Sequence, residues 1–164
     1  MAARIFVFEP NPKRAAIALG LGATVNLEGE RARQVKQIRD LTNGLGVDVA
    51  IDCAGKAGTV NLCIEAVRPG GVVSVPSVHP GPMEIDIRSV TRKPVSVVGS
   101  LGYTQEAWDR AVALIAAGRY PVERVVTSRT PRDEIVASGF EALIDPGRGE
   151  LKVLIEVNRP PRAA

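Results

Sequence analysis

One carboxylate stands where a nucleotide-binding site would use it. Ile5 to Phe8 form a continuous apolar run, typical of a buried parallel strand, and Glu9 follows that run directly. Asn11 offers a helix N-cap and Pro12 suits a first helical turn, so a helix is expected soon after the strand. An acid between such a strand and helix can hydrogen-bond the hydroxyls of a ribose. A solvated surface acid is the alternative interpretation of Glu9.

Small residues gather at the ends of three further apolar runs. These ends are Cys53-Ala54-Gly55, Val75-Pro76-Ser77 and Gly99-Ser100-Leu101-Gly102. In an open parallel sheet a ligand binds outside the carboxyl ends of the strands, and small residues let a flat ligand approach the backbone. Turn formation alone also accounts for these glycines, so ligand binding and simple chain reversal both stay open.

The phosphate-binding loop of a dinucleotide site is missing from its expected place. Such sites use G-x-G-x-x-G after the first strand, with the ribose acid ~20 residues further on. Counting back from Glu9 puts those glycines before Met1. Gly99 and Gly102 do follow an apolar run, but they provide two glycines only. The sequence therefore predicts a parallel sheet that lacks its first strand and glycine loop.

Catalytic and metal-binding side chains are scarce. The chain has two cysteines, Cys53 and Cys63, and one histidine, His79. A structural zinc site needs about four ligands at short spacings, which these residues do not supply. His79 stands in a proline-rich loop and is predicted to be a surface residue. We therefore assign no catalytic residue and no metal ligand, and two unpaired cysteines fit a reducing cytoplasm.

Apolar runs and amphipathic segments alternate from the N-terminus to about residue 99. Strands are expected at 5–8, 23–27, 47–51, 72–75 and 94–98, and helices at 14–19, 29–43, 59–67 and 88–92. This alternation favours an α/β fold with a truncated, Rossmann-like, doubly wound parallel sheet. A C-terminal α/β segment follows, with helices expected at 104–117 and 130–144 and strands at 122–127 and 151–157.

The pattern divides the chain into three parts. We interpret residues 1–103 as an incomplete nucleotide-binding domain, residues 104–158 as C-terminal helices and strands, and residues 159–164 as a disordered tail. The net charge is +3, from 21 basic and 18 acidic residues without a basic run, which disfavours nucleic acid. No apolar stretch reaches the ~18 residues needed to cross a membrane, and the N-terminus shows no signal-peptide pattern. We expect a cytoplasmic protein.

Several segments occur in an order familiar from one enzyme family. They are Phe8-Glu-Pro-Asn-Pro-Lys-Arg14, Leu21-Gly-Ala23, Gly46-Val-Asp-Val-Ala-Ile-Asp-Cys-Ala-Gly55, Val67-Arg-Pro-Gly-Gly71, Gly118-Arg119, Phe140-Glu-Ala-Leu143 and Lys152-Val-Leu-Ile155. Together they resemble the zinc-dependent medium-chain alcohol dehydrogenases, especially the sorbitol and threonine dehydrogenase-like branches. The resemblance covers residues 5–157 and corresponds to the C-terminal half of that family. It implies the cofactor-binding portion of an NAD-dependent alcohol or polyol dehydrogenase, an oxidoreductase acting on CH–OH groups.

The resemblance also implies roles for individual residues. Glu9 corresponds to the acid that binds the adenosine ribose, and it favours NAD over NADP because it repels a 2′-phosphate. The other implied cofactor residues are Lys13 and Arg14 beside that ribose, Cys53 and Ala54 flanking a ribose, Val75 and Ser77 near the nicotinamide amide, Ser100 and Leu101 in the nicotinamide-proximal turn, and Lys152 at the pyrophosphate. Pro76 stands where the family has glycine, which removes a backbone N–H from that contact.

Other parts of the family pattern have no counterpart in this sequence. The catalytic cysteine, the Gly-His-Glu segment and the four-cysteine lobe are missing, so the family's zinc has no ligands here. A metal or an equivalent acid must polarise the alcohol oxygen. We therefore expect no activity from the chain alone, and NAD binding that is weak or absent.

The missing first strand also affects the sheet. In the family's strand order it lies between the strands at 5–8 and 47–51. Without it, these two strands are expected to pair with each other, to leave a gap, or to receive a strand from another chain.

Two other functions stay open. One is a non-catalytic oligomerisation or nucleotide-binding module built on the same fold. In the family the edge strand at 95–98 pairs across a dimer, so a homodimer is expected to form there. The other is a methyltransferase-like nucleoside binder, which places an acid after its second strand but equally needs a glycine loop.

Overall fold

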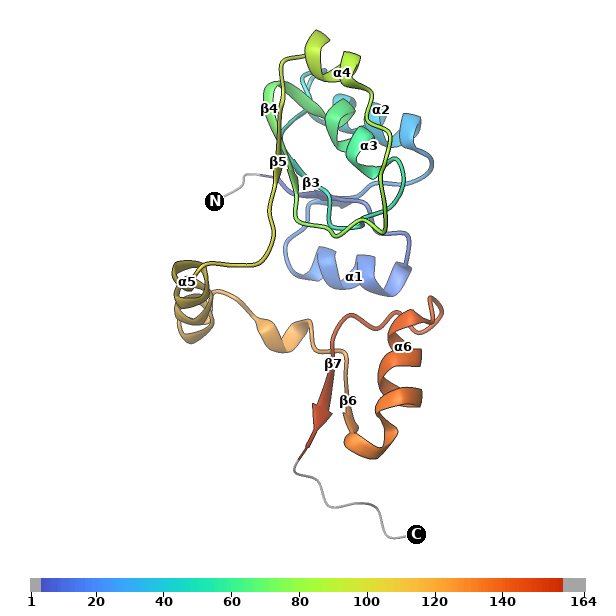
Figure 1. Cartoon of the computed structure of the whole chain (residues 1–164), viewed down its shortest axis with the longest axis vertical. Helices are drawn as coiled ribbons and strands as arrows, with labels where there is room; N and C mark the ends of the chain where they lie inside the picture. Colours follow the sequence, from blue (N-terminus) through green and yellow to red (C-terminus); the bar gives the residue numbers. More distant parts are fainter. Residues whose placement is uncertain (1–3, 158–164) are drawn as a thin grey trace. The chain divides into compact units, whose positions relative to one another are not determined.

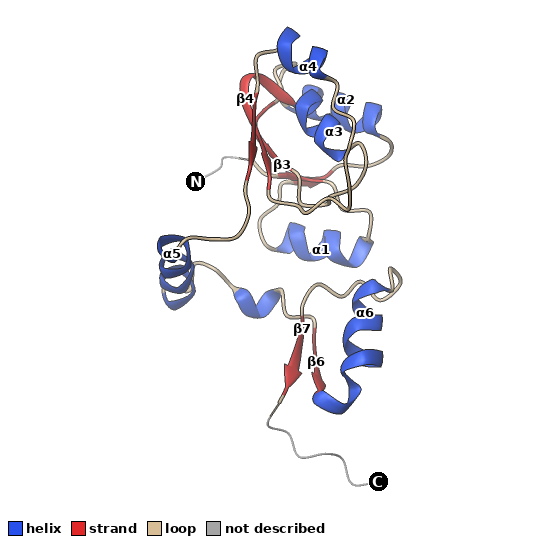
Figure 2. Ribbon diagram, viewed as in Figure 1, coloured by secondary structure: helices blue, strands red, loops and turns tan. Residues whose placement is uncertain are grey.

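The computed structural model describes residues 4–157, so the predicted tail at 159–164 lies outside the described residues. The chain forms two compact units, shown along the chain in Figure 1 and by secondary structure in Figure 2. Unit 1 contains the chain up to Leu27 and from Thr104 onward, and unit 2 contains Glu28–Tyr103. The domain boundary placed after residue 103 stays a prediction.

Unit 2 is built on a parallel sheet with the strand order β3–β4–β5. Its elements are α2 (Arg31–Leu41), β3 (Val47–Ile51), α3 (Thr59–Ala66), β4 (Val67–Val75), α4 (Ile87–Arg92) and β5 (Ser96–Gly99). A helix separates β3 from β4 and β4 from β5, because parallel neighbours need a crossover connection. Helix α3 packs against the sheet with α2 beside it (Figures 1 and 2).

The core of unit 2 lies between α3 and the sheet. Val60 and Ile64 of α3, and Val67 and Val73 of β4, are at most 1% exposed. Val60 and Ile64 are four residues apart, so both side chains lie on one face of the helix. Burying each such side chain stabilises the fold by roughly 1.5–3 kcal/mol. This cluster therefore anchors the strands whose ends carry the candidate site.

Strand β4 begins earlier than the sequence indicates. The sequence predicts a strand at 72–75, but β4 already starts at Val67, and its register with β3 shifts from Val47↔Val67 to Val49↔Val72. Gly70 adopts φ +73°, and its N–H donates to Pro94 O at 2.6 Å. The Pro69-Gly70 pair thus produces an irregularity within β4, because strands β3 and β5 on its two sides hold the backbone.

Unit 1 begins with a short βαβ motif. β1 (Phe6–Val7) and β2 (Val25–Asn26) pair in parallel, and α1 (Pro12–Gly20) connects them. The side chain of Asn11 accepts hydrogen bonds from two backbone N–H groups in the first turn of α1. The predicted N-cap and the predicted proline in the first turn are therefore both present.

The C-terminal part of unit 1 contains a second pair of parallel strands, β6 and β7. Its elements are α5 (Gln105–Ala116), the 3₁₀ turn η1 (Val122–Arg124), β6 (Ser128–Pro131), the 3₁₀ turn η2 (Arg132–Glu134), the π-helical turn η3 (Ile135–Phe140), α6 (Glu141–Ile144) and β7 (Val153–Glu156). The turns η2 and η3 and helix α6 form one helical layer beside β6 and β7 (Figure 2).

Two predictions for this part are wrong. The strand expected at 122–127 starts only at Ser128, because the chain first makes a 3₁₀ turn. The helix expected from Thr130 starts later, since Thr130 and Pro131 pair with Ile155 and Glu156 of β7. Thr130 Oγ1 is buried without a hydrogen-bond partner, so this residue does not act as an N-cap.

The predicted α/β class with a parallel sheet is confirmed, because every strand pair within residues 4–157 is parallel. Among the described strands, β1 pairs with β2 alone and β3 pairs with β4 alone. Strands β1 and β3 therefore each have one edge without a neighbour among the described strands. None of the described helices combines the length and the apolar character that crossing a bilayer requires.

Candidate functional site

The predicted ribose acid is held in place by its neighbours in unit 1. Glu9 N donates to Asn26 Oδ1 at 3.0 Å, and Asn26 Nδ2 donates back to Glu9 O at 3.1 Å. The carboxylate oxygen Glu9 Oε1 accepts from Asn11 N at 2.9 Å, just before the first turn of α1. Negative charge is stabilised there, because the free N–H groups of a helix start carry partial positive charge. The loop thus fixes a carboxylate between β1 and α1.

Glu9 also lines a cavity of about 260 Å³ in unit 1. Glu9 and Arg14 are its charged groups, and the apolar wall is formed by Val7, Phe8, Ile17, Ala18, Leu21 and Leu151. Arg14 Nε is buried there without a hydrogen-bond partner. Sites for drug-sized ligands measure ~300–1,000 Å³, so this cavity suits one nucleoside portion rather than a whole dinucleotide.

The two lysines predicted near the cofactor have different surroundings in unit 1. Lys13 Nζ donates to Gly147 O and Arg148 O, each at 3.2 Å, so this ammonium already holds the loop before β7. Lys152 is exposed and directly follows Leu151, which lines the cavity. Lys13 would have to give up these carbonyl contacts in order to bind a ligand phosphate.

A second cluster of polar side chains lies at the carboxyl end of the sheet in unit 2. Asp52 directly follows β3, and its side chain is 1% exposed. Ser77 Oγ lies 2.8 Å and His79 Nε2 lies 3.0 Å from the same oxygen, Asp52 Oδ2. The backbone N–H groups of Ala54 and Gly55 donate to Asp52 Oδ1 at 3.1 and 3.3 Å. The buried carboxylate therefore ties the turn after β3 to the loop after β4.

Asp52 is ionised at neutral pH in spite of its burial. Burial alone raises the pKa of a carboxyl group, but hydrogen bonds, led by that from the hydroxyl of Ser77, hold the pKa of Asp52 below its ordinary value. The Cys63 thiol responds in the opposite direction: burial first, and then negative charge on Asp52 and Cys53, raises its pKa to about 11. Cys63 therefore stays protonated and unreactive at neutral pH.

The prediction that His79 is a surface residue is wrong. Its side chain is only 15% exposed, because it packs against Asp52 and Ser77. These residue types also form hydrolase relays, but here the same ring nitrogen, Nε2, faces both partners, at 3.3 Å from Ser77 Oγ and 3.0 Å from Asp52 Oδ2. A relay needs one ring nitrogen for each partner, so the cluster does not activate Ser77 as a nucleophile.

The other predicted cofactor residues of unit 2 lie at the same strand ends. Cys53 and Ala54 form the exposed turn after β3. Val75 ends β4, and its carbonyl accepts a hydrogen bond from Ser100 N at 3.1 Å. Leu101 is 88% exposed. Because the strands are parallel, all the predicted residues of unit 2 gather at one edge of the sheet.

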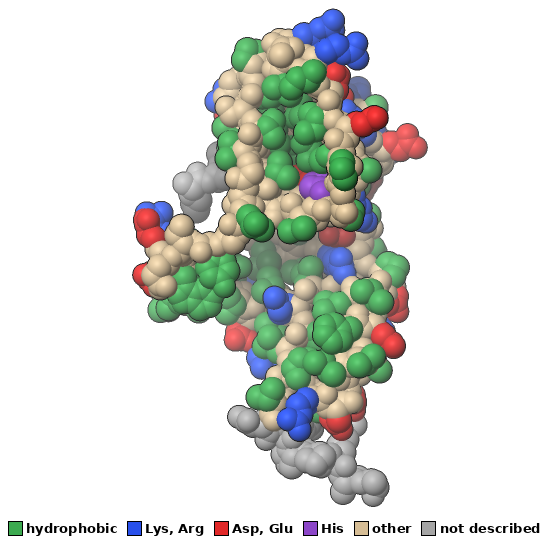
Figure 3. Space-filling model, viewed as in Figure 1, with side chains coloured by type: hydrophobic (Ala, Val, Ile, Leu, Met, Phe, Trp, Pro, Cys, Tyr) green, Lys and Arg blue, Asp and Glu red, His purple; other side chains and the backbone are tan. Residues whose placement is uncertain are grey.

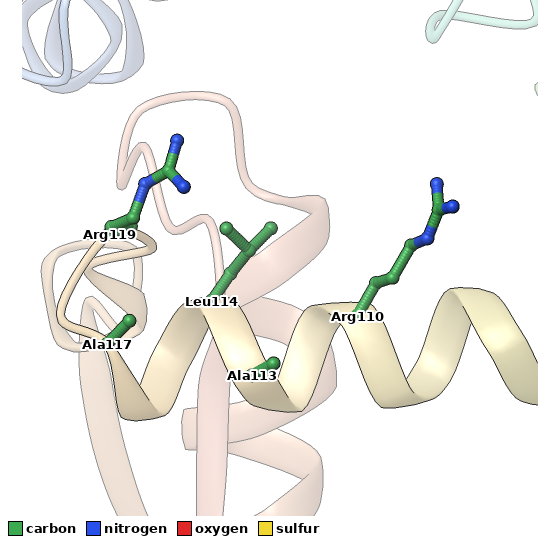
Figure 4. Close-up of a pocket in the computed structure, with 5 residues that line it drawn as sticks. All are labelled: Arg110, Ala113, Leu114, Ala117 and Arg119. Atoms are coloured by element: carbon green, nitrogen blue, oxygen red, sulfur yellow. The ribbon is translucent and has the colours of Figure 1, made fainter.

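A hollow of about 320 Å³ also lies beside α5 in unit 1 (Figure 4). Its lining consists of Arg110, Ala113, Leu114, Ala117 and Arg119. The Arg110 side chain is paired with Glu106 at 2.8 Å. The lining residues include no acid, nucleophile or metal ligand, so we assign no chemistry to this hollow.

A comparison with known families gives a match over residues 1–117, to the zinc-binding dehydrogenases. The chain belongs to the zinc-binding dehydrogenase family. The resemblance to zinc-dependent alcohol dehydrogenases that the sequence motifs indicate is thereby confirmed. The parallel α/β organisation of both units agrees with this assignment.

Curated relatives of this chain are longer proteins. The (R,R)-butanediol dehydrogenase of Neisseria gonorrhoeae is 29% identical over 124 residues, which are 76% of this chain and 35% of that protein. The L-threonine 3-dehydrogenase of Bacillus licheniformis is 29% identical over 144 residues, which are 87% of this chain and 41% of that protein. The chain thus spans less than half the length of these relatives.

Solved structures of the same family have the same fold. The 2R,3R-butanediol dehydrogenase of Bacillus subtilis matches with a TM-score of 0.84 and 27% identity, over 96% of this chain and 44% of that one. An alcohol dehydrogenase of Thermus sp. ATN1 matches with a TM-score of 0.84 and 33% identity, over 96% of this chain and 45% of that one. Nearly the whole described chain therefore follows the family fold.

The described residues of this chain do not fit a zinc ion. Residues 4–157 contain no group of three or more His, Cys, Asp or Glu side chains that could hold a metal. The single histidine is engaged with Asp52. A catalytic zinc needs three protein ligands, so we derive no step through a metal held by these residues.

Proposed function

We propose that this chain forms the NAD-binding part of a dehydrogenase that oxidises alcohols or polyols, and that it is inactive alone. The observation that carries the proposal is the fixed carboxylate of Glu9. Asn11 N donates to this carboxylate and Asn26 holds the backbone of Glu9, so the carboxylate stays between β1 and α1, where it lines a cavity of nucleoside size. A ribose offers two adjacent hydroxyl groups, and a fixed carboxylate with a vacant oxygen lone pair accepts their hydrogen bonds.

The same carboxylate supports NAD as the cofactor in preference to NADP. A 2′-phosphate on the ribose would bring like charge against Glu9, and like-charge contacts at a binding site cost several kcal/mol. Arg14 lines the same cavity, and its buried Nε without a partner is a donor that a bound nucleotide can satisfy. NAD, when bound, supplies the hydride acceptor of the reaction.

The substrate class is supported by the relatives. The names of these proteins refer to butanediol, to threonine and, for a protein of Enterococcus avium that is 27% identical over 146 residues, to D-arabitol phosphate. We infer a substrate with a CH–OH group. The described residues form no metal site that could polarise the oxygen of this group. We therefore propose that the chain alone is inactive.

A second proposal concerns an oligomerisation role. Strand β5 is at one edge of the sheet in unit 2, and all four of its residues are exposed. Val97 and Val98 are 41% and 50% exposed. An exposed edge with apolar side chains is a template for pairing with another strand. We propose that two copies of the chain pair along β5 as a homodimer.

Chemical-shift mapping with NAD tests the cofactor proposal. We expect saturable shifts in the turn from Glu9 to Arg14 and at the ends of β3 and β4, because the predicted contacts lie there. Glu9→Gln should reduce the shifts near α1, while Glu84→Gln, which alters an exposed carboxylate, should leave them unchanged. NAD shifts that are absent from both regions, or equal in the two variants, would refute the proposed site.

A further inference from the structure

The loop between β4 and α4 is fastened to the rest of unit 2 at two places. Near its start, His79 contacts the buried carboxylate of Asp52. Near its end, Asn61 of α3 donates to Glu84 O at 2.9 Å and accepts from Asp86 N at 3.0 Å. The contact made by His79 is the one closest to Ser77, which the proposed cofactor site includes.

The loop also approaches the turn after β3 closely. A Cβ atom placed on Gly55 would lie 2.9 Å from Val78 O, which is too close for any side chain. Gly55 has φ +61°, a conformation that glycine adopts without strain. The backbone of Val78, which directly follows Ser77, is therefore packed against Gly55 in the turn after β3.

The hydrogen atoms of the cluster can be assigned from its chemistry. An ionised Asp52 only accepts hydrogen bonds, so the ring nitrogen His79 Nε2 must carry the proton it shares at 3.0 Å. The hydroxyl of Ser77 likewise donates to Asp52, at 2.8 Å. Ser77 Oγ keeps its lone pairs, and one of them faces His79 Nε2 at 3.3 Å. The cluster thus leaves Ser77 as an acceptor toward any further partner.

We propose that His79 is a positioning residue. Its contact with Asp52, called the clasp below, holds the loop against the sheet and presents Ser77 as a hydrogen-bond acceptor to the carboxamide of nicotinamide. The carboxamide NH₂ group is a donor, so it complements an oxygen whose own proton is already committed. The role toward nicotinamide rests on the proposed NAD-binding function, whereas the clasp itself does not.

Nuclear magnetic resonance of the single histidine tests the clasp on the full chain. The Nε2 proton of a solvent-exposed imidazole exchanges too fast to be seen. We expect an observable ring N–H signal for His79 that disappears in Asp52→Ala, because alanine offers no acceptor in place of the carboxylate. Absence of this signal in the unaltered protein, or its persistence in Asp52→Ala, would overturn the clasp.

Hydrogen exchange of the loop amides provides the variant test. His79→Ala should speed exchange at residues 77–79 on the order of tenfold, the effect of losing one charge-assisted hydrogen bond. His79→Gln keeps an N–H donor at a similar reach and should restore slow exchange. Val78→Ala, at a neighbouring side chain that is 78% exposed, is the matched control and should behave as the unaltered protein. Equal exchange in all three variants would contradict the proposal, and His79→Gln decides it if His79→Ala does not fold.

Titration with nicotinamide mononucleotide tests the second part. We expect shifts at the Ser77 amide that weaken several-fold in His79→Ala and return in His79→Gln. Equal shifts in both variants would show that the clasp does not position Ser77. If the unaltered protein shows no shift while the ring N–H signal is present, the clasp stands, and both its role toward nicotinamide and this end of the proposed NAD site fail.

Discussion

Asp52 combines near-complete burial with a full set of hydrogen-bond donors. Its two oxygens accept from two backbone N–H groups, the hydroxyl of Ser77 and the ring of His79. A buried carboxylate that lost these donors would be strongly destabilising. At the scale of single residues, the carboxyl end of the sheet in unit 2 is therefore organised around the negative charge of Asp52. The family resemblance assigns no cofactor contact to this residue.

The stability of the protein should depend on the ionisation of Asp52. Its pKa is lower in the folded chain than in the unfolded chain, so its contribution is fully present above the unfolded value of about 3.9 and is lost as pH falls through the folded value. Asp52→Asn should remove this acid dependence and lower the free energy of unfolding by about 1–3 kcal/mol at pH 7. Urea denaturation at several pH values measures both effects.

Asp48→Asn is the matched control for that change. Asp48 lies in the same strand, β3, but its side chain is 82% exposed and forms a surface ion pair with Arg68. Such pairs contribute ~0–1 kcal/mol. If the two variants were destabilised equally, the special role of the buried carboxylate would be wrong.

At the scale of secondary-structure elements, short sequence patterns predicted the features that depend on interactions between residues close together in the chain. The N-cap at Asn11 and the strand at Val47–Ile51 form where the sequence places them, because capping and apolar runs act over a few residues. Thr130 also has N-cap spacing, but strand pairing with β7, some 25 residues away, keeps it extended. A short sequence pattern does not reveal that pairing with a distant strand competes with helix formation at Thr130.

The candidate site likewise has one part that a local sequence pattern predicts and another part that it does not. Glu9 could be found because an acid after a buried strand is a local pattern. The contact between Asp52 and His79 joins residues 27 positions apart, through a loop whose prolines and glycine suggest only an irregular surface segment. The loop closes onto the sheet because Met83 and Val90 pack against the core of unit 2, which no short motif indicates.

The free edge of β5 leads to a prediction about assembly. Val97→Lys should shift a homodimer toward monomer, because a charged side chain on an edge strand disfavours strand pairing. Sedimentation equilibrium measures the change in dissociation constant. Ile51→Lys, in the opposite edge strand β3 and 59% exposed, is the control and should leave the dimer intact. An unaltered protein that is monomeric at all concentrations would refute pairing along β5.

At the scale of the whole molecule, each unit exposes apolar surface. In unit 1 no residue of α5 is buried, and Trp108 is 52% exposed; Figure 3 shows hydrophobic side chains gathered over this helix. In unit 2, Val49 and Ile51 of β3 are 54% and 59% exposed. Contiguous apolar surface of this kind marks contact sites for other protein segments, which agrees with the greater length of the relatives.

The proposal that the chain alone is inactive leads to a prediction about catalysis. Purified protein mixed with zinc, NAD and butanediol should produce no NADH absorbance above a blank without protein, because the described residues offer no zinc site. A rate that increases with zinc concentration would show that the chain holds a catalytic metal, and the proposal of an inactive part would then be wrong.

Calorimetric titration of the chain with NAD and with NADP tests the central claim most directly. The claim is that Glu9 and its cavity bind the adenosine side of NAD while the sequence lacks the G-x-G-x-x-G loop that would hold the pyrophosphate. The account predicts a dissociation constant for NAD in the millimolar range or weaker, and still weaker binding of NADP because of its 2′-phosphate. A micromolar dissociation constant for NAD, or tighter binding of NADP than of NAD, would contradict it.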